Sequence, residues 1–63
     1  MNKKLESLRV DMEDHFGSAR INDQSVMVNR QELNKDDIHF LNQLADVRVR
    51  RSGTGVVIIA KAA

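Results

Sequence analysis

The first apolar residues of the chain recur at intervals of three and four positions, which is the spacing of one face of an α-helix. They are Leu5, Leu8, Met12 and Phe16. Gly17 follows directly, and glycine readily adopts the left-handed conformation that ends many helices. Glu6 and Arg9 lie three positions apart on the opposite side, where they can form an ion pair. The pattern predicts a helix from Lys3 to Phe16.

After Gly17 the apolar positions change to a period of two, which is typical of β-strands. The residues concerned are Ala19, Ile21, Val26 and Val28. They flank Asn22-Asp23-Gln24-Ser25, a run of residues that favour turns. We predict a short β-hairpin here, with strands of about three to five residues, near the lower limit for strands.

Two positions could begin the next helix, since Asn29 with Glu32 and Asn34 with Asp37 both match a capping box. We favour the start at Asn34. Downstream of it, one apolar stripe consists of Ile38, Leu41, Leu44 and Ala45. Acids at the start of this helix would also interact favourably with its dipole. The predicted helix runs from Lys35 to Leu44.

The segment from Val47 to Ala60 predicts a strand, a turn and a second strand. Valine and arginine alternate in the first strand, so one of its faces should be exposed to solvent. Ser52-Gly53-Thr54-Gly55 forms the predicted turn. The second strand contains Val56 to Ile59, is apolar at every position, and should be buried on both faces.

A turn of this length also sets the register between the two strands. Val49 should face Ile58 on one side of the hairpin, and Arg50 should face Val57 on the other. The aliphatic stems of the arginines would then lie beside Val57 and Ile59.

These elements predict a single α+β domain over residues 1–63, in the order α-β-β-α-β-β. Two helices pack on a mostly antiparallel sheet that ends in a basic β-hairpin. We expect the core to consist of the apolar residues that share the inward faces. They are Leu5, Leu8, Met12, Phe16, Ile21, Val26, Val28, Ile38, Leu41, Leu44, Val49 and Ile58.

Charge divides the chain into two parts. All nine acids lie at or before Asp46, and against six cations they give residues 1–46 a net charge of −3. Residues 47–63 contain four cations and no acid, a net charge of +4. Those cations are Arg48, Arg50, Arg51 and Lys61. Such asymmetry points to a polyanion or an acidic protein surface as the partner.

The short length limits how the fold can be stabilised. A chain of 63 residues buries only ~60% of the surface that its unfolded form exposes. Without cysteine it can form neither a disulfide nor a zinc site of the thiolate kind. Association with a second copy is the remaining means, so we expect a homodimer.

The basic N-terminus precedes an amphipathic segment, and no apolar stretch could span a bilayer, so we expect a cytoplasmic protein with no membrane partner.

Few residues could carry out catalysis. The chain lacks Cys and Tyr, and its serines lie in no nucleophile motif. Asp11 with His15 and Asp36 with His39 have helical spacing, but such pairs are common on helix surfaces. A strand, not a helix, follows Gly53-Thr54-Gly55, so we interpret those residues as a turn and not as a phosphate-binding loop. We therefore expect no enzyme activity, no cofactor, no metal and no small-molecule substrate.

The basic hairpin suggests a function instead. We expect a small regulator or architectural factor that contacts nucleic-acid phosphates through Arg48, Arg50, Arg51 and Lys61. Because no aromatic residue accompanies these cations, duplex DNA or structured RNA is a better expected partner than a single strand.

Other interpretations of the same residues stay open at this point. The arginines could protect an edge strand from unwanted pairing, or pair with the acidic helices of their own chain. They could also meet the acidic helices of another copy in a homo-oligomeric assembly module. Finally, a helix followed by a basic hairpin resembles the order of the last helix and the wing in winged-helix DNA-binding domains.

Overall fold

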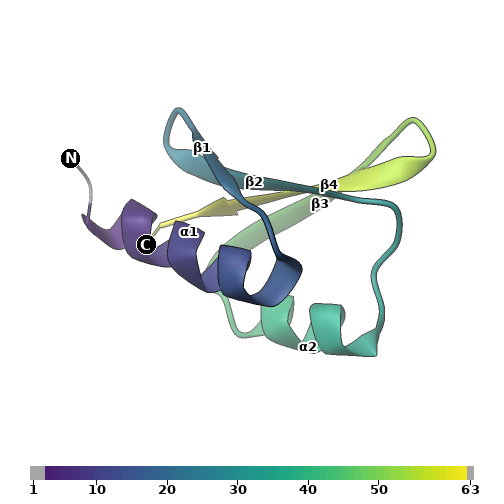
Figure 1. Cartoon of the computed structure of the whole chain (residues 1–63), viewed down its shortest axis with the longest axis horizontal. Coiled ribbons are helices and arrows are strands. Elements are labelled where there is room, and N and C mark those ends of the chain that lie inside the picture. Colours follow the sequence, from purple (N-terminus) through teal and green to yellow (C-terminus); the bar gives the residue numbers. More distant parts are fainter. Residues whose placement is uncertain (1–2, 63) are drawn as a thin grey trace.

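The computed structural model describes residues 3–62 and contains two helices and one four-stranded sheet (Figure 1). The elements are α1 (Lys3–Phe16), β1 (Arg20–Asn22), β2 (Ser25–Arg30), α2 (Lys35–Asn42), β3 (Asp46–Ser52) and β4 (Gly55–Lys61). This order confirms the predicted α+β fold.

The sheet has the strand order β1-β2-β4-β3, and every neighbouring pair is antiparallel. The second strand of the basic hairpin, β4, therefore lies in the interior of the sheet, whereas β3 and β1 form its edges. Figure 1 shows both helices on the same side of the sheet. Within residues 3–62 no helix covers the other face, which we call the open face (Figure 1).

Local signals end α1 and begin α2 where the sequence predicts. Gly17 has φ +90°, and its N–H donates to the carbonyl of Glu13 over 2.7 Å. At α2 the side chain of Asn34 accepts from the N–H of Asp37, and the Asp37 carboxylate accepts from the N–H of Asn34. This reciprocal capping box satisfies two backbone donors that the first helical turn leaves unpaired.

The end of α2 differs from the prediction. The helix ends at Asn42, and not at Leu44, because the next N–H groups bond three residues back. The N–H of Gln43 donates to Phe40 O, and that of Leu44 donates to Leu41 O, each over 3.1 Å. Hydrogen bonds to the third preceding residue are common in the last turn of a helix.

Both hairpin turns are shorter than predicted, because the outer residues of each predicted turn pair as strand. Asn22 pairs with Ser25, and Ser52 pairs with Gly55, so each turn contains only two central residues. The first central residue has positive φ in both, 58° at Asp23 and 60° at Gly53. Positive φ at this position occurs in the primed turns whose twist matches that of paired strands.

The core lies between the helices and the sheet and consists of eight buried apolar residues. They are Leu5, Met12, Phe16, Val26, Val28, Leu41, Ile58 and Ala60. The first seven confirm the prediction, and the predicted Leu8 and Leu44 are partly buried against this cluster.

The core prediction is wrong for three residues. Ile21, Ile38 and Val49 are 41%, 49% and 45% exposed. Ile21 and Val49 belong to the edge strands, where no further strand covers them. Ala60 was not predicted but is buried in the core, because it lies in the interior strand β4. Its side chain is too small to indicate a core position in the sequence.

Gly55 lies where β4 begins beside the end of β2. A Cβ at this position would come within 2.5 Å of the carbonyl oxygen of Arg30, a backbone atom. We expect Gly55→Ala to lower the free energy of unfolding by about 2 kcal/mol, as overpacking commonly does. Urea unfolding measures this loss. Equal stability of the variant and the original protein would show that the two backbones separate at no cost.

Candidate nucleic-acid interface

The register of the basic hairpin agrees with the prediction. Val49 pairs with Ile58, and Arg50 pairs with Val57. Because side chains alternate along a strand, Arg48 and Arg50 project from the face opposite to buried Ile58. That face is the open face. Their Cα atoms are about 7 Å apart, as for any residues two positions apart in a strand.

The predicted Lys61 is on the same face as Arg48 and Arg50. It follows Ile59 by two positions in β4, and it pairs with Ser25 on one side and with Asp46 on the other. Asp46 therefore faces the same way. It is the one acid that alternation places among the strand residues of the open face within the described part of the chain.

A cation that the sequence analysis did not select also belongs to the open face. Arg20 in β1 pairs with Met27, Met27 with Ile59, and Ile59 with Arg48. One row across all four strands therefore begins and ends with arginine and is apolar in between. Alternation of Arg20 with the apolar Ile21 could have indicated its outward direction, but only the strand order places it in the row of Arg48.

Arg51 is separated from the other predicted site residues. It pairs with Val56 and alternates with Arg50, so its side chain starts from the side of the sheet that carries the helices. It is exposed near the hairpin turn, and it also contributes to the wall of a hollow on the open face. The predicted site thus comprises three cations on one face and a fourth at its margin.

Within residues 3–62, the cations of the open face have no side-chain partner. Among residues 3–62, no ion pair or side-chain hydrogen bond involves Arg20, Arg48 or Arg50. Three acids of the helices have other partners, since Glu6 and Glu13 pair with Arg9, and Asp37 pairs with His15. The hypothesis that the hairpin arginines pair with the acidic helices of their own chain is therefore wrong.

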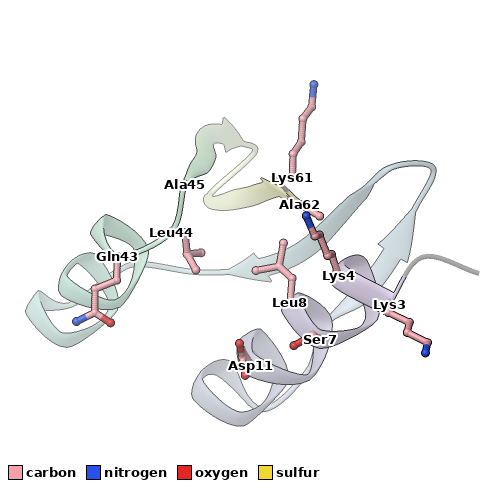
Figure 2. A pocket seen from close by; sticks show the side chains of 10 residues that line it. All are labelled: Lys3, Lys4, Ser7, Leu8, Asp11, Gln43, Leu44, Ala45, Lys61 and Ala62. Carbon is pink, nitrogen blue, oxygen red and sulfur yellow. The ribbon is translucent and has the colours of Figure 1, made fainter.

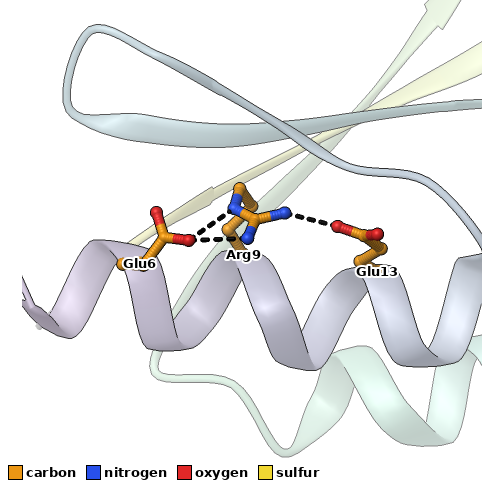
Figure 3. A network of polar contacts seen from close by, with 3 residues as sticks. All are labelled: Glu6, Arg9 and Glu13. Atoms are coloured by element: carbon orange, nitrogen blue, oxygen red, sulfur yellow. Dashed lines mark hydrogen bonds and ion pairs between the residues drawn. The ribbon is translucent and has the colours of Figure 1, made fainter.

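Arg9, in contrast, pairs with side chains of its own helix (Figure 3). Its Nε and Nη2 donate to Glu6 Oε1 over 3.0 and 2.6 Å, and its Nη1 donates to Glu13. The hydrogen bond from Arg9 holds the pKa of Glu6 below its ordinary value. Arg30 is engaged as well, because its Nη1 donates to the carbonyl of Phe16 over 3.1 Å. These two arginines support the fold, unlike those of the open face.

Both histidines contact other side chains of the chain. His15 pairs not with Asp11 but with Asp37, Nε2 lying 2.8 Å from Oδ1. Its ring stacks on Phe40 with centroids 4.5 Å apart, which connects the end of α1 to α2. His39 contacts Gln43 over 3.2 Å. No group of three His, Asp or Glu residues suited to a metal ion occurs in the described part of the chain.

Asp37 is the buried acid of this cluster, with 6% of its surface exposed. The hydrogen bond from the Asn34 N–H holds its pKa below the ordinary value, burial opposes this, and the His15 ring adds to the lowering. Asp37 is thus charged in the native state at neutral pH and connects both helices.

A separate hollow of about 480 Å³ lies between the start of α1 and the connection from α2 to β3. Figure 2 shows Leu8 and Leu44 facing each other across it, whereas Lys61 extends away from both. Lys3 and Lys4 line the same hollow. Ser7 and Asp11 also line it, and its apolar walls and lysines suit an amphipathic anion.

No family model, curated protein or solved structure matches this chain. Neither helix of the described residues is long and apolar enough to cross a membrane.

Proposed function

We propose that this protein is a small, non-enzymatic nucleic-acid-binding factor, and that the open face of its sheet contacts the phosphates. The observation that carries the proposal is the row of residues across the sheet. It places Arg20 and Arg48 on opposite edge strands of one face, with Arg50 and Lys61 in adjacent rows. Cations without partners on an extended surface provide the electrostatic attraction on which nucleic-acid binding depends.

A symmetric dimer through this face fits the geometry less well. In a twofold interface the same patch meets itself. Two copies joined in this way would bring the arginines of one chain against those of the other. Like charges placed together at an interface oppose association. The open face therefore suits a polyanion better than a second open face, although the half-buried Val57 and Ile59 would suit either.

Two other interpretations account for less of the structure. Charges on β1 and β3 do fit edge protection, since both are edge strands. Edge protection does not explain Lys61, however, because Lys61 lies in the interior strand β4. For the winged-helix order, a helix-turn-helix needs a helix shortly before α2, and the described residues there form the hairpin of β1 and β2.

Replacing Arg48 and Arg50 together with alanine tests the proposal. We expect the double variant to bind nucleic acid about tenfold more weakly, and its slope of log affinity against log salt to fall by roughly one per arginine. Fluorescence anisotropy with labelled DNA and RNA across a salt series measures both quantities. Lys35→Ala is the charge-matched control, because Lys35 is an exposed cation of α2 with no side-chain partner among residues 3–62. It should leave the slope unchanged.

Arg51→Ala should weaken binding less than Arg50→Ala, in keeping with its place at the margin of the face. Sedimentation of the same variants separates binding from assembly. If the arginine variants change the oligomer mass and the unaltered protein binds neither DNA nor RNA at low salt, the homo-oligomeric assembly module replaces this proposal. Low salt is the decisive condition because electrostatic attraction is then strongest.

A further inference from the structure

We propose that the nucleic acid on the open face is single-stranded and lies across the strands, with unstacked bases against Met27, Val57 and Ile59. This inference rests on the proposed function and specifies its ligand. It differs from the expectation of a duplex that the lack of aromatic residues suggested. What changes the expectation is the apolar centre that the strand order creates between the arginines.

The centre of the open face is apolar although no helix covers it. The two interior strands supply Met27 from β2 with Val57 and Ile59 from β4, and all three are half-buried. The edge strands supply the arginines on either side. The amide of Asn22 donates to the Met27 sulfur over 3.0 Å, which confirms that the thioether lies on this face. Phosphate contacts alone would not require such a centre.

Met27 lines two hollows. One, of about 190 Å³, is lined by Arg20, Met27 and Asn29 among others. The second, of about 210 Å³, is lined by Met27, Arg50 and Val57 among others. The lining of each hollow thus combines apolar side chains with an arginine. Met27 is common to both, and its polarizable, flexible side chain adapts readily to a flat ligand.

These hollows offer what an unstacked base needs. In recognition of single strands, bases stack on aromatic rings or on the plane of an arginine guanidinium. Arg20 and Arg50 can fulfil that role here, since neither is held by another side chain within residues 3–62. Asn29 adds an exposed amide that can donate to and accept from base edges. Arginine thereby compensates for the missing aromatic residues.

A duplex would use this face poorly. The major groove is about 12 Å wide and admits a helix or a two-stranded ribbon. Four strands at about 4.8 Å spacing place β1 and β3 roughly 14 Å apart before side chains are counted. The face as a whole is therefore too wide to enter the groove. A duplex resting on the arginines would leave the apolar centre without an apolar partner.

The test compares one nucleotide sequence as a single strand and as a duplex. A length of about ten nucleotides lies within the range of known site sizes for single strands. We expect the single strand, as DNA or RNA, to bind at least tenfold more tightly at low salt. Met27→Ala should weaken single-strand binding about tenfold without changing the salt slope, because it removes no charge. Ile59→Ala should act in the same direction, and it serves if Met27→Ala disrupts the fold.

Methyl NMR of the unaltered protein gives a second measurement that needs no variant. The single strand should shift the Met27 methyl signal and leave that of Met12 unchanged, since Met12 is completely buried. Duplex binding that equals or exceeds single-strand binding, with no shift of Met27, would overturn this inference and leave the proposed function intact. Failure of both forms to bind at low salt would overturn the proposed function itself.

Discussion

Replacing Ile58 with alanine is expected to remove a large part of the stability of this domain. Ile58 is fully buried in the interior strand β4, where it pairs with Val28 and Val49. Truncating a buried isoleucine to alanine costs about 2 to 5 kcal/mol, because apolar contact is lost and a cavity remains. At roughly 0.05 to 0.15 kcal/mol per residue, 63 residues provide about 3 to 9 kcal/mol in total. Urea unfolding followed by circular dichroism measures the loss.

Ile59→Ala is the matched control, because it removes the same atoms from the next residue of the same strand. Ile59 points to the open face and is only half-buried, so its truncation should cost about 1 kcal/mol, in proportion to the smaller area it buries. The two variants should also differ in binding, since only Ile59 belongs to the proposed interface. Equal destabilisation by both would mean that the open face is covered as completely as the core, as in a tight oligomer.

Replacing Asp37 with alanine should have the second largest effect, a loss of about 2.5 kcal/mol in the free energy of unfolding. The change removes the acceptor for the Asn34 N–H, 3.1 Å away, and the partner of His15, 2.8 Å away. Losing helix-capping interactions costs about 1 kcal/mol, and a hydrogen bond to a charged group contributes about 1.5 kcal/mol more. Thermal unfolding at neutral pH measures the difference.

The same substitution should alter the pH dependence of stability. The pKa of Asp37 is lowered in the folded protein, so its contribution is complete above the unfolded-state value of about 3.9. It is lost as the pH falls through the lower folded-state pKa. Asp37→Ala should therefore flatten the decline in stability below about pH 4. Asp36→Ala, an exposed acid in the same helical turn, should retain that decline. A decline of equal steepness in both variants would contradict this role.

Local patterns of the sequence determined the elements and much of their pairing. The capping box of Asn34 and Asp37 predicts the start of α2, because it depends on residues only three positions apart. The turn at Gly53 predicts the register that places Arg50 opposite Val57. Contacts of this kind connect neighbours along the chain, so the sequence contains enough information to predict them.

Contacts between distant segments were decided by the tertiary structure alone. Alternation along one strand says which side chains share a face, but not which strand lies beside it. The order β1-β2-β4-β3 places Arg20 in the row of Arg48. It also makes the apolar β4 an interior strand between β2, which contains Met27, and β3, which contains the hairpin arginines. Placing both helices on one side then leaves the opposite face open (Figure 1). The basic face with its apolar centre thus depends on packing between elements, which no local pattern specifies.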